Sequence, residues 1–174
     1  MAHPEAQPLA FDLKPISSGA LENALEKAEH YRLLNQPHLA ESICLDVLAV
    51  DAVNQKALII LLLAMTDQFD SPSSRNIKKA MDIASRLRDE YSRNYYRGIV
   101  LERQAAATLK SGVPSSNVDA CEWFLEAMKC YEKAESLSLR DNNDAVLRWN
   151  TCARAIMQHN LKQRPIEEYI PVLE

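Results

Sequence analysis

The stretch KALIILLLAMTDQF, residues 56–69, decides the fold, because apolar side chains occupy nearly every side of the helix that it would form. A surface helix carries one apolar stripe, whereas a helix that is apolar all round is buried among other elements. The long middle of the chain is rich in Ala, Leu, Glu, Lys and Arg, which lose little on entering a helix. We therefore expect an all-α protein with this helix at the centre of its core.

Apolar residues spaced by three and four predict further amphipathic helices on both sides of this central one. Pro37 suits the first turn of a helix, and Pro72 and Pro114 fall in turns between helices. The seven predicted helices begin near Leu21, Pro37, Lys56, Ile77, Tyr95, Ser116 and just after Asn143, and the fifth, opened by Tyr95 and Tyr96, reaches Leu109. The first is expected to end near Asn35, so that the first two form a hairpin.

Polar residues at three of these starts predict helix caps. Ser17 and Ser18 precede the first helix, and Ser116 with Asp119 fits a capping box. The cluster at residues 141–143 suits the start of the last helix. In that helix we expect Ala145, Trp149, Cys152, Ala153, Ile156 and Met157 to face inward and Arg148, Asn150, Thr151 and Arg154 to face outward.

The composition limits the classes of partner. Hydrophobic residues make up 47% and charged residues 25% of the 174 residues, as in a globular domain. A net charge of −4 gives no basic field for nucleic acid. The apolar run Ala57–Met65 has about half the length of a bilayer span, and the first residues lack a basic-then-apolar signal. We expect a soluble cytoplasmic protein that binds neither nucleic acid nor membrane.

The chain divides into three parts by composition. Residues 1–17 carry three prolines and predict an extended or disordered arm, whereas 18–163 predict one helical domain. Residues 164–174 form an apolar C-terminal tail with two prolines. Because so apolar a terminus needs burial, we expect the tail to pack on the protein's own surface or on a neighbouring subunit as a homo-oligomer contact.

Residues able to do chemistry are scattered. Cys121 and Cys130 would point to opposite faces of a helix, and Cys44 and Cys152 fall within apolar stripes as core cysteines do. The histidines have too few neighbouring ligands for a metal, and three glycines cannot build a phosphate loop. We therefore expect no catalytic residues, no metal and no cofactor.

Several predicted helices share a pattern of small and bulky residues. In the first hairpin Ala28 and Tyr31 are followed by Ala40, Cys44 and Val47. In the last helix the spaced residues are Trp149, Cys152, Ala153 and Ile156, and in the central helix Leu58, Leu61, Leu62 and Met65. This pattern resembles the degenerate repeats of the tetratricopeptide repeat (TPR) superfamily. The resemblance implies a right-handed α-α solenoid of about three TPR-like hairpins plus a C-terminal capping helix.

The same resemblance implies a concave groove that holds a peptide or helix of a partner. The groove positions would be Leu25, Glu29, Arg32, Ile59, Leu63, Asn150 and Arg154. In the family members that clamp a C-terminal carboxylate, the first two clamp positions are Lys and Asn, where this chain has Leu25 and Glu29. Asn150 and Arg154 remain candidates for bonding a partner's backbone or carboxylate.

One cluster outside the groove combines aromatic and basic residues. Tyr95, Tyr96 and Arg97, beside Arg93, form either a contact patch for a partner or the packed start of a helix. We expect overall a non-catalytic adaptor or scaffold that binds another protein. A small secretion-type TPR chaperone is one alternative, and a helical enzyme or ligand-binding regulatory domain is an alternative of another class.

Overall fold

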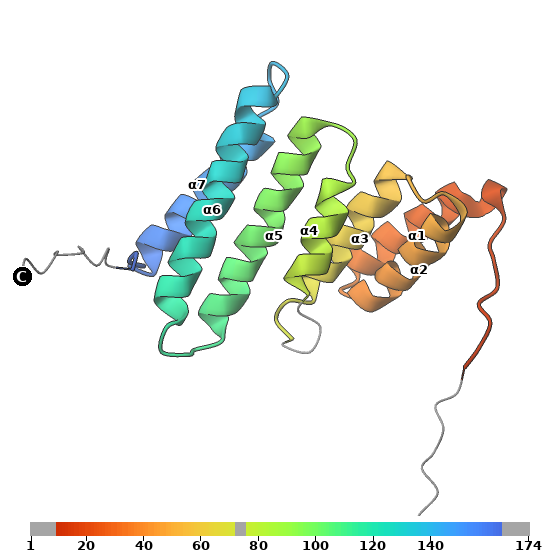
Figure 1. Cartoon of the computed structure of the whole chain (residues 1–174), viewed down its shortest axis with the longest axis horizontal. Coiled ribbons are helices and arrows are strands. Elements are labelled where there is room, and N and C mark those ends of the chain that lie inside the picture. Colours follow the sequence, from red (N-terminus) through yellow and green to blue (C-terminus); the bar gives the residue numbers. More distant parts are fainter. Residues whose placement is uncertain (1–9, 72–75, 165–174) are drawn as a thin grey trace, which may run out of the picture.

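The chain is all-helical in the residues 10–71 and 76–164 that the computed structural model describes (Figure 1). One short 3₁₀ helix precedes seven α-helices: η1 (Ser18–Ala20), α1 (Leu21–Leu33), α2 (Pro37–Val50), α3 (Gln55–Asp67), α4 (Ile77–Ser85), α5 (Glu90–Lys110), α6 (Ser116–Leu137) and α7 (Asp144–Gln158). The predicted all-α class is therefore confirmed. None of the helices within the described ranges combines the length and the apolar character that a bilayer crossing demands.

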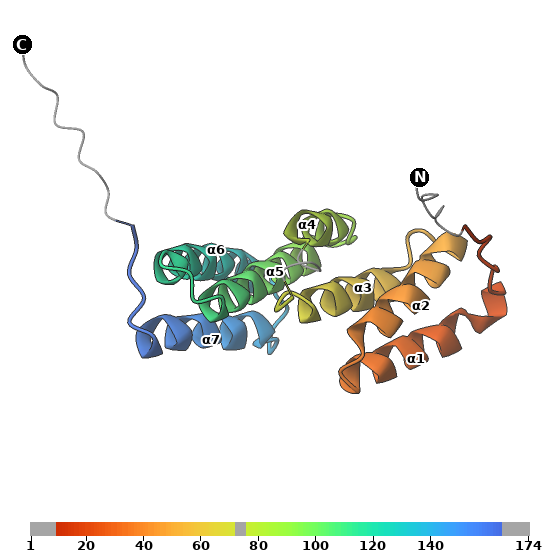
Figure 2. The same cartoon turned by 90° about the horizontal axis from the view of Figure 1, so that it is seen from below.

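The helices lie side by side in chain order, from α1 and α2 at one end to α6 and α7 at the other (Figure 1). Each helix contacts the next one, and α3 also contacts α1 and α5. In the view turned by 90° (Figure 2), α2 lies above α1, α4 lies above α3, and α6 lies above α5 and α7. The odd-numbered helices α1, α3, α5 and α7 therefore share one face, which we call the odd-helix face.

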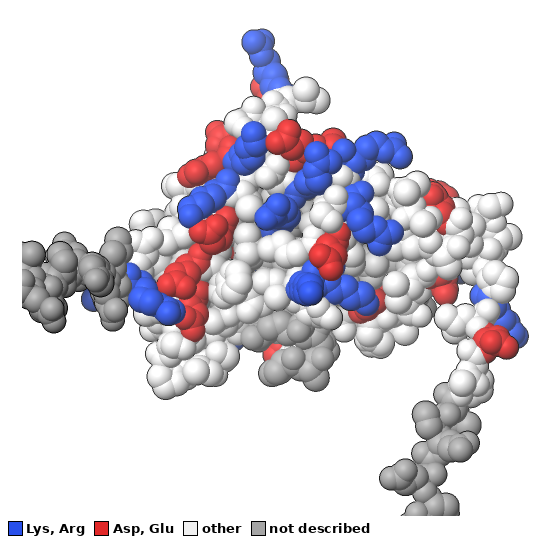
Figure 3. Space-filling view, in the orientation of Figure 1, with Lys and Arg blue, Asp and Glu red and all other residues white. Residues whose placement is uncertain are grey.

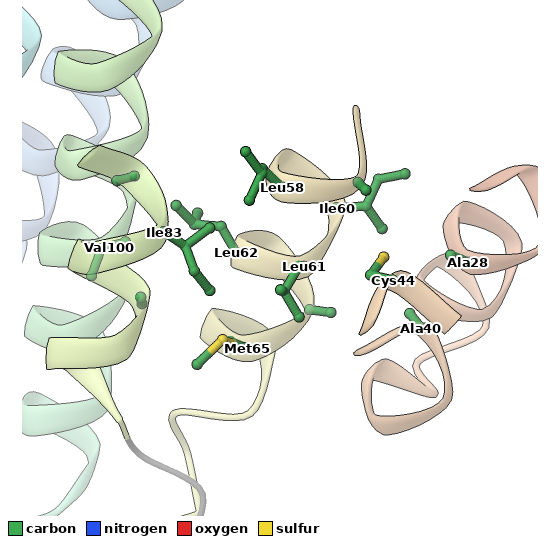
Figure 4. Close-up of a cluster of buried hydrophobic side chains, with 14 of the residues drawn as sticks. Ala28, Ala40, Cys44, Leu58, Ile60, Leu61, Leu62, Met65, Ile83 and Val100 are labelled. Carbon is green, nitrogen blue, oxygen red and sulfur yellow. The ribbon is translucent and has the colours of Figure 1, made fainter. Parts of the chain in front are cut away.

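Helix α3 is the centre of the larger core cluster, as its all-round apolar sequence predicts. Its Leu58, Leu61 and Leu62 are at most 2% exposed. Figure 4 shows Leu62 directed toward Ile83 and Val100 on one side, and Ile60 toward Cys44 on the other. Burying one such side chain stabilises the fold by about 1.5–3 kcal/mol. Helices on both sides of α3 are thus held through it.

A second core cluster joins α5, α6 and α7 around Phe124, Tyr131 and Cys152, which are all buried. Leu63, Met81 and Tyr96 pack against both clusters. The two clusters are therefore joined at α3, α4 and α5 into one packed row.

The start of α5 differs from the prediction. The helix begins at Glu90 rather than Tyr95, because Asp89 caps it by accepting a 2.7 Å hydrogen bond from the backbone N of Ser92. Tyr91, Arg93 and Tyr95 lie in its first turns, and they show no clear helical spacing of apolar residues in the sequence. Pro37, in contrast, occupies the first turn of α2 as predicted.

The predicted caps are wrong in detail. Neither η1 nor α1 has a side-chain cap, so Ser17 and Ser18 do not act as caps. The N-cap of α6 is Ser115, one residue before the prediction, and its hydroxyl donates to the Asp119 carboxylate at 2.7 Å instead of capping the backbone. At α7 the N-cap is Asn143, within the predicted cluster, although its side chain makes no capping bond; Asn142 instead accepts from the backbone N of Asp144 at 3.1 Å.

Two side chains of α7 face differently from the prediction. Arg148, expected outside, is half-buried because it reaches Glu102 on α5. Met157, expected inside, is 66% exposed, because α7 is the last described helix and no further helix covers that side.

Three predicted segments are described in part or not at all. Residues 10–17 of the predicted arm contain no helix, and 1–9 lie outside the described residues. The turn predicted near Pro72 falls largely in 72–75, and the apolar tail falls in 165–174 apart from Arg164, both outside the described ranges.

Candidate functional site

An ion-pair ladder crosses the odd-helix face and centres on one carboxylate. Asp67 of α3 accepts from Arg32 Nε of α1 at 2.6 Å and from Arg103 Nη1 of α5. Arg103 Nη1 also donates to Thr66 Oγ1 at 2.9 Å and to the Leu63 carbonyl at 3.2 Å. All three charged side chains are 22–24% exposed. Charge-assisted bonds at this partial burial are stronger than neutral ones, so the ladder fixes α1, α3 and α5 against one another.

More exposed ion pairs flank the ladder. Lys110 Nζ lies 2.7 Å from Asp70, and Lys56 Nζ lies 3.1 Å from Glu22 and 3.6 Å from Glu29. Exposed pairs contribute about 0–1 kcal/mol each. These side chains therefore place charges at the rim of the odd-helix face, but they stabilise the face less than the ladder does.

A hollow of about 490 Å³ opens between α5 and α7. Its lining consists of Ala106, Leu109 and Lys110 of α5, Phe124 of α6, and Ala155 and His159 near the end of α7. Phe124 is 3% exposed, so it forms part of the floor, whereas Lys110 and His159 supply polar groups. The hollow therefore offers an apolar floor beside one ammonium group and one imidazole.

The α7 wall of this hollow is anchored by a buried polar network. Tyr131 of α6 donates to Glu102 Oε2 at 2.6 Å, and Arg148 Nη1 of α7 reaches Glu102 Oε1 at 3.2 Å. Glu102 is only 8% exposed. Burial, and then the neighbouring Glu102 carboxylate, raise the pKa of Tyr131 far above its ordinary value. The network thus joins α5, α6 and α7 through one carboxylate.

The predicted groove residues have different surroundings. Leu25 is 1% exposed in the core and offers no surface to a partner. Arg32 belongs to the ladder, and Glu29 pairs with Lys56. Ile59 and Leu63 are half-buried against the core. On α7, Asn150 is half-buried and Arg154 is exposed.

The predicted tyrosine patch is largely packed. The rings of Tyr91 and Tyr95 stack with centroids 5.7 Å apart, and Tyr96 meets Tyr95 edge-on at 5.2 Å. Burial, followed by the charges of neighbouring tyrosines, raises the pKa of Tyr96 to about 12. Arg97 is exposed. The tyrosines thus act mainly as packing between the two core clusters, and Arg97 alone of the predicted trio offers open surface.

Sequence reasoning missed Asp67, Arg103 and Lys110. A signal was present, because Arg32 and Asp67 are 35 residues apart and Asp67 and Arg103 are 36 apart, close to the length of one TPR repeat. Arg103 and Lys110 are also seven residues apart on one helix, which places them on one side of it. Reading charges at repeat spacing would have found the ladder.

A comparison of this chain with family models, with curated proteins and with solved structures finds no match in any of the three. Within the described ranges, no group of three or more His, Cys, Asp or Glu side chains is placed to hold a metal ion.

Proposed function

We propose that this chain is a protein-interaction module, an adaptor or scaffold, whose odd-helix face binds a segment of another protein. The observation that carries the proposal is the open hollow between α5 and α7, with an apolar floor and a polar rim. A surface of this kind suits the anchor side chain of a peptide or helix. Because α3, α5 and α7 are already joined by the ladder and the Glu102 network, little ordering would be lost on binding.

We infer a partner segment that carries an apolar side chain next to a carboxylate. The apolar side chain would rest on Phe124, Ala106 and Ala155, and the carboxylate would pair with Lys110 and accept a hydrogen bond from His159. Lys110 would exchange its exposed partner Asp70 for the guest. Polar contacts of this kind at a solvated rim favour selectivity and fast association more than raw affinity.

The finer architecture belongs to the same proposal: a right-handed solenoid of TPR-like hairpins capped by α7. It is supported by contacts that recur at one repeat length. Lys56 donates a hydrogen bond to Glu22, and Arg86 donates one to the Ala52 carbonyl; each pair is separated by 34 residues. The backbone N of Arg88 donates to the side chain of Gln55, a separation of 33 residues. A stack of similar hairpins brings residues one repeat apart into contact. The four free cysteines fit a reducing cytoplasm as its place of work.

The experiment compares proteins retained from an extract of the source cells by three immobilised chains: the wild type, Ala106→Arg and Ser42→Arg. Ala106→Arg fills the hollow with a charged side chain, whereas Ser42 is exposed on α2 and serves as the matched control. Circular dichroism first establishes that all three have equal helix content. We expect a protein that the wild type and Ser42→Arg retain and Ala106→Arg loses.

The partner class is then tested with immobilised peptide libraries. Peptides that place Asp or Glu beside Leu, Ile or Phe should bind the wild type, and their Lys counterparts should not. Equal retention of every extract protein by all three chains, together with no charge preference among the peptides, would contradict the proposal.

A further inference from the structure

A second hollow lies on α6, away from the odd-helix face. It measures about 350 Å³ and is lined by Glu122, Leu125, Glu126, Met128, Lys129, Glu132 and Gln163. Leu125 and Met128 are half-buried. Acidic side chains follow the lower part of α6 on the face shown in Figure 3. The hollow is therefore an apolar strip along α6 with a charged border.

The charges of that border are already compensated. Glu126 pairs with Lys129 at 2.6 Å, and Glu132 accepts from the indole N–H of Trp149 at 3.0 Å. Glu122 lies 3.3 Å from Arg164 Nε. An acidic segment can therefore approach the strip without meeting three bare carboxylates.

The chain after α7 turns as it does after α1. Asn35 has a φ of 57°, and the backbone N of Gln36 donates to the Tyr31 carbonyl at 2.9 Å. Asn160 has a φ of 48°, and the backbone N of Leu161 donates to the Ile156 carbonyl at 3.0 Å. Both are the helix-ending turn with a left-handed residue after the helix. After α1 this turn sends the chain back as α2, which packs along α1.

The residues after this second turn are held against α6. Leu161 is 8% exposed within the second core cluster. Arg164 Nη2 lies 2.8 Å from Asp119 Oδ1, near the start of α6, in addition to its contact with Glu122. Gln163 itself lines the hollow. The described chain therefore ends at the mouth of the apolar strip.

We propose that residues 165–174, which lie outside the described residues, occupy this strip of α6 in the same chain. Ile166, Tyr169 and Ile170 are spaced by three and one, so in a helical turn they would share one face, with Glu167 and Glu168 on the other. Ten residues span at most about 33 Å when extended, and the strip from Glu122 to Glu132 covers roughly 15 Å of helix. The segment is thus long enough to cover the strip.

The test uses the full chain labelled with ¹⁵N and two reciprocal substitutions. Ile170→Glu alters the segment, and Met128→Glu alters the strip. We expect Ile170→Glu to shift the amide resonances of residues 122–132 and 163, and Met128→Glu to shift those of residues 166–173. Ser42→Glu on the exposed side of α2 is the control and should move neither set.

Two results would overturn the proposal. In the first, Ile170→Glu leaves the resonances of 122–132 where they are in the wild type. In the second, the reciprocal shifts disappear on dilution while sedimentation reports a dimer, which assigns the strip to the segment of a second copy. Because Met128 lines the strip and not the hollow between α5 and α7, the resonances of residues 122–132 and 166–173 report on the segment separately from partner binding in that hollow.

Discussion

Gly98 of α5 lies so close to Tyr131 of α6 that a Cβ on Gly98 would stand 2.4 Å from Cε1 of the tyrosine ring. That ring is fully buried, and its hydroxyl is fixed by the Glu102 carboxylate at 2.6 Å. The absence of a side chain at Gly98 therefore sets how closely the two longest helices approach. The same contact brings Glu102 within reach of Arg148 on α7.

Gly98→Ala should destabilise the protein, although alanine is the better helix former. The added methyl collides with a ring that cannot withdraw without breaking its hydrogen bond, and overpacking of this kind costs about 1–3 kcal/mol. Urea unfolding measures the difference. Gly19→Ala is the matched control, since nothing lies within 4 Å of its added Cβ. A Gly98→Ala protein as stable as the control would show that the helices separate freely.

Tyr131→Phe should lower the free energy of unfolding by roughly 1.5–3 kcal/mol, the range for a hydrogen bond to a charged group. The cause is that Glu102, 8% exposed, loses one of its two partners. Glu102→Gln and the double variant complete a cycle, and we expect the two losses to be less than additive. Strict additivity would mean that the two groups do not interact.

The protein should lose stability as the pH rises from about 8.5, where thiols of an unfolded chain begin to ionise. Burial is the largest of the effects that raise the pKa of Cys44, Cys152 and Tyr96 to about 12 in the folded chain. Above the unfolded values the folded state holds protons that the unfolded state has released, so stability falls with pH. Urea unfolding at pH 7, 9 and 10.5 measures this. A stability that is constant or rises over that range contradicts it.

The four cysteines should differ in reactivity toward a thiol reagent at pH 8. Cys44, Cys121 and Cys152 are at most 2% exposed, and burial raises the pKa of each. Burial also raises the pKa of Cys130, but its side chain is only half-buried, so the reagent can reach it and we expect it to react first. In Cys130→Ala the fast phase should vanish, and in urea every remaining thiol should react together. Fast labelling of a second cysteine in the folded protein would go against the packing described.

The number and approximate places of the helices were predictable because they depend on the local spacing of apolar residues. The apolar sequence of α3 likewise predicted that this helix lies in the core. Features that depend on residues far apart in the sequence could be seen only in the structure. Arg148 looked like an outward residue until Glu102, 46 positions earlier, gave it a partner. The start of α5 was not predicted correctly, because the capping residue Asp89 is followed by an aromatic cluster without a clear helical spacing.

The candidate site was predictable only in part for the same reason. Arg32 was expected in the partner groove from the resemblance to TPR repeats, and it lies in the ion-pair ladder on the odd-helix face. Leu25 was also expected in the groove, but its side chain, about two turns of α1 before Arg32, is buried by neighbouring helices that the sequence alone cannot position. The hollow takes part of its floor from Phe124 on α6, a buried residue whose nearness to α5 and α7 depends on how the helices pack.

The central claim is that a guest binds in the hollow between α5 and α7. The direct measurement is the amide spectrum of the ¹⁵N-labelled full chain, titrated with a peptide from the library that places a carboxylate beside an apolar residue. We expect shifts centred on five residues that line the hollow, Ala106, Leu109, Lys110, Ala155 and His159. Shifts confined to α2, α4 and the outer side of α6, with those five residues unmoved, would contradict it.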